Sequence, residues 1–244
     1  EKRDLLTDSE NRVDMRDRLV CSVDPLGCKD IDDALHVKRL QNGNFEVGVH
    51  IADVSHFVKE MAAIDEEASN RSTSVYLADR RIDMLPKPLT EDICSLNKGV
   101  ERLAFSVVWE LTPEADTVKV DFFKTVIKSR HNFAYEEAQA WIDDSSRSDE
   151  LTQSLRHLMS LSKVLRKRRI DAGALVLASA EVQFSKDENY QPVEIGLHAH
   201  HDTNEMVEEW MLAANVAVAE KIWKHFPSYA VLRRHPAPMP QMFD

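Results

Sequence analysis

Four aspartates close together in the sequence have the residue type and spacing that metal chemistry requires. They fall within ten residues, in the segment DPLGCKDIDD, and are Asp24, Asp30, Asp32 and Asp33. Like charges held this close raise one another's pKa unless a cation compensates them. Carboxylate oxygens are also the ligands that Mg²⁺ and Mn²⁺ prefer. The segment therefore predicts a divalent-metal site.

Two other interpretations of the acidic segment stay open at this point. The carboxylates could cap turns and face water, as acidic loops commonly do. A calcium loop of the EF-hand type is a weaker alternative, because it needs alternating acidic ligands, a glycine at the sixth position and a distal glutamate. The segment does not have that order.

The composition is typical of a folded protein. The 244 residues are 43% hydrophobic, which is enough for the core of one large domain or two small ones. Three cysteines without a close pair favour neither disulfides nor zinc and predict a reducing, intracellular compartment. The charged first residues, and the lack of an apolar run near ~18 residues, predict a soluble protein. The net charge of -11 does not exclude RNA, because carboxylates that hold cations present positive charge to phosphate.

The first 130 or so residues are predicted to form an antiparallel sheet. Runs of β-branched and aromatic residues between turn residues occur at 19–23, 34–40, 45–51, 103–111 and 118–127. Asn42-Gly43 indicates a type I′ hairpin, and 112–116 a second hairpin loop. If the first turn pairs Gln41 with Asn44, Asp32 lies opposite Asp53. That register would bring a fifth carboxylate to the cluster.

The later residues have a helical period. Leu151, Leu155, Leu158, Ser162 and Leu165 form one stripe, with Gly173 as a C-cap. A short strand is expected at 180–184. A second helix is predicted over 204–225, with Asn204 as N-cap and a buried stripe of Val207, Met211, Ala214, Val218 and Ile222. Strands first and helices later predict an α+β fold, a largely antiparallel sheet flanked by helices.

Several motifs in a fixed order resemble one family. They are DPLGCKDIDDALH, NGNFEVGVHIADVSHFV, TSVYLADRRIDMLP, DICSL, RLAFSVVWEL and MVEEWMLAAN. Together they resemble the RNB catalytic domain of the ribonuclease II and R family, and most of all its eukaryotic branch, which serves the RNA exosome. The resemblance extends over residues 12–235.

The resemblance implies an activity, a cofactor and partners. It implies hydrolytic 3′-to-5′ degradation of single-stranded RNA to nucleoside 5′-monophosphates, with Mg²⁺ or Mn²⁺ and two ions in the active complex. By matching position, Asp24, Asp30, Asp32 and Asp33 would be both the catalytic residues and the metal ligands, with Asp32 the most critical. Two metals can activate a water and stabilise the leaving oxygen. Exosome core subunits are the implied protein partners, and the nucleus, nucleolus and cytoplasm the implied locations.

The resemblance also implies residues that bind RNA. Tyr76 matches an aromatic that stacks on the last base at the 3′ end, a contact that tolerates any base. Glu208 or Glu209, together with Asn215, would line the RNA path, and Arg233 lies in a basic stretch that would meet RNA. The basic run at 163–169 is better explained by the negative end of a helix dipole. His198, His200 and His201 are expected in an exposed loop.

The resemblance further implies that residues 1–244 are the N-terminal portion of one RNB domain. The expected remainder is an arginine-rich second half, flanking OB-type domains and an N-terminal endonuclease-like domain. The activity of residues 1–244 alone would then be incomplete. Two alternatives stay open: another metal phosphoesterase built on paired aspartates, and a non-catalytic RNA-binding or scaffold module.

Overall fold

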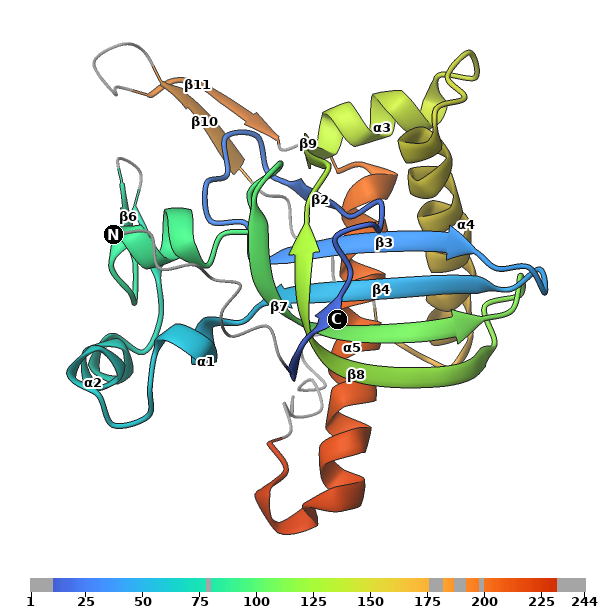
Figure 1. The fold of residues 1–244 in the computed structure, drawn as a ribbon. Helices are drawn as coiled ribbons and strands as arrows, with labels where there is room; N and C mark the ends of the chain where they lie inside the picture. The colour runs from blue at the N-terminus through green and yellow to red at the C-terminus, as the bar shows by residue number, and fades with distance from the viewer. Residues whose placement is uncertain (1–10, 78–79, 176–181, 187–191, 198–199, 232–244) are drawn as a thin grey trace.

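A computed structural model describes residues 11–77, 80–175, 182–186, 192–197 and 200–231. A seven-stranded sheet dominates the α+β fold, in the strand order β1-β8-β7-β4-β3-β2-β9 (Figure 1). The strands are β1 (Val13–Asp14), β2 (Cys21–Asp24), β3 (Asp33–Arg39), β4 (Phe45–Ala52), β7 (Glu101–Leu111), β8 (Thr117–Lys128) and β9 (His131–Ala134). The predicted antiparallel core is confirmed, since β2, β3, β4, β7 and β8 pair antiparallel in turn.

Two strands at the edges of the sheet were missed by the sequence prediction. β1 pairs with β8 and β9 pairs with β2, both in parallel. Strands of two and four residues are too short to show a period of two. β9 matters for the site, because it holds β2 along its whole length as far as Asp24.

Three helices cover one face of the sheet. They are α3 (Tyr135–Asp143), α4 (Glu150–Asp171) and α5 (Asp202–His225), and α4 and α5 run behind the sheet in Figure 1. Leu155 and Leu158 of α4 and Trp210 of α5 are buried against apolar side chains of the strands. The helix predictions are confirmed, with Gly173 at a φ of 96° just past α4.

The start of α5 differs from its prediction. The helix begins at Asp202, and Asn204 is the third residue inside it, where its side chain accepts a hydrogen bond from the His201 backbone at 2.9 Å. Asn204 therefore caps the helix from within, as the second half of a capping box does. The predicted stripe is buried at Val207 and Ala214, whereas Ile222 is exposed.

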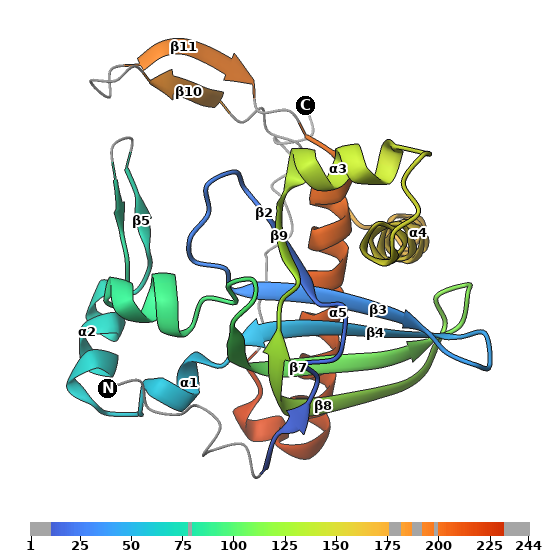
Figure 2. The same ribbon diagram turned by 45° about the horizontal axis from the view of Figure 1, so that its top comes forward.

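Smaller elements stand beside the sheet. Between β4 and β7 lie α1 (Val54–Phe57), α2 (Ala63–Arg71), the hairpin β5 (Val75–Tyr76) and β6 (Arg81–Ile82), and the π-helix η2 (Pro88–Ile93). A second hairpin, β10 (Val182–Lys186) with β11 (Pro192–Leu197), stands away from the seven-stranded sheet, at the top of Figure 2. A 3₁₀ turn, η3 (Pro227–Tyr229), follows α5. No helix in the described residues is long and apolar enough to span a membrane.

The register of the β3–β4 hairpin is one residue away from the predicted one. Leu40, not Gln41, pairs with Asn44, through a 2.8 Å hydrogen bond from the Leu40 backbone N–H. The loop has three residues and ends with Gly43 at a φ of 88°, which is the left-handed residue of a three-residue hairpin loop. Asp32 therefore lies opposite Ala52, whose N–H donates to the Asp32 carbonyl at 2.9 Å. The predicted pairing of Asp32 with Asp53 is wrong.

A buried polar chain crosses the sheet on the face away from α5. His36 Nδ1 lies 2.7 Å from His50 Nε2, and His50 Nδ1 lies 2.6 Å from Ser106 Oγ. Ser106 Oγ in turn lies 2.7 Å from Thr125 Oγ1. All four side chains are fully buried, so each needs the partner that its neighbour supplies. Gly48 leaves the space for this chain, since a Cβ there would lie 2.2 Å from His36 Cε1.

We expect Gly48→Ala to lower the free energy of unfolding by about 1–3 kcal/mol, the usual cost of overpacking a filled core. His36 cannot move aside without breaking its contact with His50. Urea unfolding followed by circular dichroism measures the change. Lys38→Ala, at an exposed position of β3, is the control and should change stability by less than about 0.5 kcal/mol. Equal stabilities of the two variants would show that the polar chain is not closely packed.

Candidate active site

Two adjacent strands position the aspartate cluster. Asp24 is the last residue of β2 and Asp33 the first of β3, and the loop between them carries the other two carboxylates. Gly27, at a φ of 81°, allows the tight turn in which the Cys28 N–H donates to the Pro25 carbonyl at 3.0 Å. In Figure 2 this loop rises from the end of the sheet, between the β5–β6 hairpin and α3.

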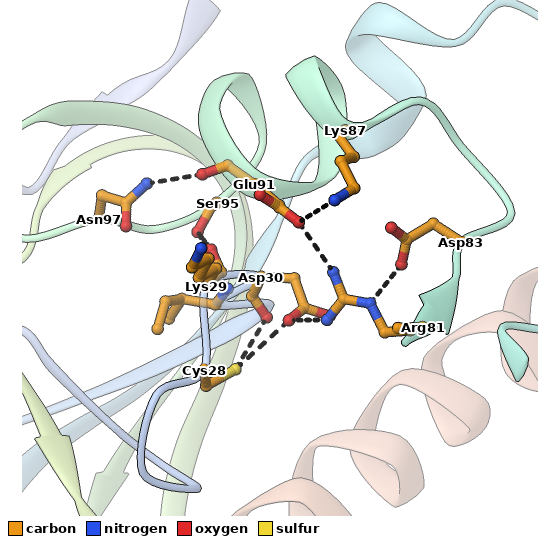
Figure 3. A network of polar contacts seen from close by, with 10 residues as sticks. Cys28, Lys29, Asp30, Arg81, Asp83, Lys87, Glu91, Ser95 and Asn97 are labelled. Carbon is orange, nitrogen blue, oxygen red and sulfur yellow. Dashed lines mark hydrogen bonds and ion pairs between the residues drawn. The ribbon is translucent and has the colours of Figure 1, made fainter. Parts of the chain in front are cut away.

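Asp30 is fixed by its neighbours on both sides. Ser95 Oγ donates to the Lys29 carbonyl at 2.8 Å and accepts from the Ile31 N–H at 3.0 Å, so it grips the backbone around Asp30. The Asp30 carboxylate itself accepts a hydrogen bond from the guanidinium of Arg81 (Figure 3). Neither Ser95 nor Arg81 was singled out from the sequence, because they lie 64 and 51 residues from their partners.

Partial burial and mutual repulsion change the pKa values of the carboxylates. Burial raises the pKa of Asp33 to about 7, with further increases from the charges of Asp24 and Asp32. Burial also raises the pKa of Asp24 to about 6; Ser22 opposes this through a hydrogen bond, and the charges of Asp32 and Asp30 add to it.

The negative charge of the cluster also affects the pKa values of two further groups. The pKa of Asp32 is raised by partial withdrawal from water and by the charge of Asp30, with Arg81 acting in the opposite direction. Burial raises the pKa of Tyr135, the first residue of α3, to about 12, and the charges of Asp24 and Asp33 contribute. Each of the four carboxylates therefore lies close enough to at least one of the others for their charges to interact.

One carboxylate oxygen in the cluster lacks a partner. Asp24 Oδ2 is buried and makes no hydrogen bond, which is costly for a charged oxygen unless a cation or a proton satisfies it. Oxygen donors of this kind fit Mg²⁺ or Mn²⁺. Within the described residues, no three His, Cys, Asp or Glu side chains already stand as a complete metal-binding set. The donors suit a hard divalent cation, which would need the carboxylates to reorient toward it.

Asp53 does not belong to the cluster. Its carboxylate lies 2.7 Å from Arg12 Nη2 and 2.6 Å from Lys124 Nζ, and it accepts a hydrogen bond from Ser55 Oγ at 3.0 Å. Burial acts to raise the pKa of Asp53, but the bonds from Lys124, Arg12 and Ser55 outweigh it and hold that pKa low. Two cations already neutralise this carboxylate, so Asp53 is not the fifth carboxylate of the cluster.

The predicted RNA-binding residues lie in different surroundings. Tyr76, on the β5–β6 hairpin, is 75% exposed, so its ring is free to stack on a base. Glu208 and Asn215 of α5 are exposed as well, whereas Glu209 is buried and accepts a hydrogen bond from Arg169 Nε at 3.0 Å. Of the two glutamates, Glu208 is the exposed one, with its carboxylate 3.6 Å from Arg169 Nη2. Arg233 lies outside the described residues.

The basic run on α4 joins the two long helices. Lys163 pairs with Asp202 at 2.6 Å and Arg166 with Glu205 at 2.7 Å. Arg169 pairs with Glu209, so the three pairs follow one another along both helices. Interhelical ion pairs therefore account for Lys163, Arg166 and Arg169, whereas Lys167 pairs with Asp171 of the same helix and Arg168 with Asp116 of a loop. His200 is exposed and lies just before α5, as predicted, and His201 is half-buried as the N-cap of α5; His198 lies outside the described residues.

Comparison with known proteins shows which family this chain belongs to. The family model of the RNB domain matches residues 12–244. The chain belongs to the RNB domain family. It is 59% identical, over 96% of its length, to exosome complex exonuclease RRP44 homolog A of Arabidopsis thaliana. It is 50% identical, over 97% of its length, to exosome complex exonuclease RRP44 of Homo sapiens. It spans only 25% of the length of each of these relatives.

Solved structures agree on the fold. The RNase R of Mycoplasma genitalium, in complex with ribose methylated single-stranded RNA, matches all of this chain with a TM-score of 0.90 and 29% identity, and the match covers 38% of the RNase R chain. Yeast Ssd1, described as a pseudonuclease, matches 95% of this chain with a TM-score of 0.77 and 22% identity, over 28% of its own chain. The second likeness concerns the fold alone, so the RNB fold by itself does not decide activity.

We expect Asp33→Asn to become more stable relative to the wild type as pH rises from 5 to 8 in EDTA. Folding raises the pKa of Asp33 from 3.8 to about 7, so the stabilisation that comes from holding this proton is lost as pH rises through about 7. The difference in unfolding free energy should change by up to a few kcal/mol, since one pKa unit corresponds to about 1.4 kcal/mol.

Urea unfolding of both proteins at each pH gives this difference. The lowered pKa values of the buried His36 and His50 make stability rise with pH, the opposite of the effect of Asp33. Because both proteins contain these histidines, their contribution cancels in the difference. Adding Mg²⁺ should stabilise the wild type at pH 8, where the carboxylates are charged. A difference that is the same at both pH values would mean that Asp33 ionises normally in the folded protein.

We expect Arg169→Met to lower the free energy of unfolding by about 2 kcal/mol or more, because it leaves the carboxylate of Glu209 buried without its partner. The double variant Arg169→Met with Glu209→Gln should recover part of this loss. Lys167→Met is the control, since its ion pair with Asp171 is exposed on both sides. Calorimetry measures all three variants, and a neutral Arg169→Met would contradict the role given to this pair.

Proposed function

We propose that this chain carries the metal-binding carboxylates of a hydrolytic 3′-to-5′ exoribonuclease. The substrate is single-stranded RNA, the products are nucleoside 5′-monophosphates, and the cofactor is Mg²⁺ or Mn²⁺, with two ions in the active complex. The observation that carries the proposal is the unpartnered buried oxygen of Asp24, surrounded by the charges of Asp30, Asp32 and Asp33. Among the described residues, only Asp30 of the four carboxylates has a cation as partner, namely Arg81. Crowded, partly buried carboxylates that lack counter-ions destabilise a protein, so a binding requirement is the simplest physical reason to keep them.

The residues of the cluster would divide the work by position. Asp24 and Asp33 end and begin rigid strands, so they would hold their ligands in a fixed geometry. Asp32, which is exposed in the loop just before β3, is the carboxylate best placed to meet a substrate. Bound divalent cations would supply the charge needed to activate a water and neutralise the leaving oxygen.

The assignment to RNA and to the exosome rests on the relatives. Those with about half or more of their residues identical to this chain are named exosome complex exonucleases, and an RNase R with the same fold was solved with single-stranded RNA. Tyr76 would stack on the base at the 3′ end, and Glu208 and Asn215 would face the RNA path. Since the chain spans a quarter of these relatives, exosome core subunits are proposed as partners of the whole protein only.

A second candidate function is RNA binding without turnover. The observation in its favour is the shared fold with a protein described as a pseudonuclease. The intact aspartate cluster argues against it, because a surface that only binds phosphate gains nothing from four crowded carboxylates.

We expect Asp32→Asn to reduce the degradation of single-stranded RNA by the full-length protein at least a hundredfold, with RNA affinity changed much less. The substrate carries a label at its 5′ end, so progressive shortening reports 3′-to-5′ direction and internal cuts would report an endonuclease. EDTA should abolish degradation of RNA by the wild type, and Mg²⁺ should restore it.

Asp143→Asn, at an exposed position of α3, is the matched control and should degrade RNA at the wild-type rate. Unchanged degradation by the Asp32→Asn variant, or by the wild type in EDTA, would contradict the metal-carboxylate proposal. RNA binding without any turnover by the wild type in Mg²⁺ would favour the second candidate. Hydrolysis of a phosphomonoester in place of RNA would indicate a different phosphoesterase.

A further inference from the structure

The β5–β6 hairpin has little of its own to keep it in place. Its strands have two residues each, and a hairpin of that size is not stable alone in water. Val75, Tyr76, Leu77 and Ile82 are all exposed, so no apolar core anchors it. The position of the hairpin must therefore come from side-chain contacts with the neighbouring elements.

Arg81 supplies such a contact, and it reaches the aspartate cluster. Its guanidinium binds Asp30 of the carboxylate loop and Asp83 of its own segment, and it lies 3.7 Å from Glu91 of η2 (Figure 3). The side chains of Arg81, Asp30 and Asp83 are 21%, 19% and 8% exposed, so water screens these charges only in part. Charge-assisted hydrogen bonds in such surroundings hold both partners firmly.

The same contacts close a ring around the loop. Ser95, which follows η2, grips the backbone on either side of Asp30, and the Leu96 N–H donates to the Ile31 carbonyl at 2.9 Å. The carboxylate loop, η2 and the hairpin are therefore linked to one another, and Arg81 ties the hairpin to a carboxylate of the cluster.

The register of the β5–β6 hairpin connects these contacts of Arg81 to Tyr76. Tyr76 and Arg81 are directly opposite each other in the hairpin, and opposite residues in an antiparallel pair project from the same face. We propose that Arg81 is a positioning residue: by binding Asp30, it sets the distance between the ring of Tyr76 and the carboxylates. This inference rests on the proposed function, in which Tyr76 stacks on the 3′-terminal base and the carboxylates act on the adjacent phosphodiester.

Arginine is suited to this role because its planar guanidinium can bind two carboxylates at once in fixed directions. A lysine would keep the charge beside Asp30 but lose the fork that also holds Asp83. A shift of the terminal base by about 1 Å can reduce a rate about a hundredfold, since the phosphodiester then leaves its reactive position. The binding of the remaining nucleotides does not depend on this distance.

The test uses the full-length protein and a single-stranded RNA whose 3′-terminal base is 2-aminopurine. In EDTA, stacking on Tyr76 should quench its fluorescence in the wild type, and Tyr76→Ala should remove the quenching. Arg81→Met should lose most of the quenching while RNA affinity changes less than about twofold. In Mg²⁺, its kcat should fall about tenfold or more with KM little changed, and Arg81→Lys should recover part of both losses.

A double-mutant cycle separates positioning from a simple charge effect on the metal site. If Arg81 acts through Tyr76, Arg81→Met should change kcat less than twofold in the Tyr76→Ala background. Independent effects that multiply in the double variant would overturn the proposal. Arg71→Met is the matched control: this arginine holds the same hairpin by donating to the Asp83 carbonyl at 3.0 Å, and its other partner among the described residues is Glu67, outside the cluster. It should keep the quenching.

Equal losses in Arg71→Met and Arg81→Met would overturn the proposal, because any loosening of the hairpin would then suffice. Wild-type quenching and turnover in Arg81→Met would overturn it as well, while leaving the exoribonuclease assignment intact. A wild type that neither quenches nor degrades RNA would overturn the proposed function itself. If Arg81→Met lowers the melting temperature, Arg81→Lys carries the comparison.

Discussion

Repulsion among four carboxylates is the constraint on which the rest of the structure depends. Partial burial raises the pKa values of Asp24 and Asp33 to about 6 and about 7, and the charges of the neighbouring aspartates add to this effect. A flexible loop would relieve this repulsion by moving the charges apart. Here two paired strands fix the ends of the loop, and Ser95 fixes its middle. The fold therefore keeps the four carboxylates near one another despite their repulsion, which the proposed cations would offset.

The large sheet provides the rigidity that this arrangement needs. β2 is held between β3 and β9. Helices α4 and α5 share an apolar core with the sheet, and ion pairs join the two helices to each other. The smaller elements between β4 and β7 contribute differently. They bring an exposed tyrosine and a bridging arginine to the edge of the cluster, where a terminal nucleotide would be held.

Local patterns predicted much of this fold, and contacts between distant residues were the part that they missed. Runs of period two and period 3.6 located the central strands and long helices, because burial on one face imposes those periods. Asn42-Gly43 indicated the turn but not the loop length, and the extra residue shifted Asp53 away from Asp32. The four aspartates were found because they are close in sequence. Arg81 was not, since its contact with Asp30 depends on the placement of a separate hairpin.

The proposed divalent-metal site includes the unpartnered oxygen of Asp24. Crystals of the full-length protein grown with Mn²⁺, which scatters anomalously, test this most directly. We expect an anomalous peak within about 2.3 Å of Asp24 Oδ2, with a second carboxylate of the cluster among its ligands. A well-ordered cluster without such a peak, in which a protein donor satisfies Asp24 Oδ2 and Asp30 still faces Arg81, would contradict the claim.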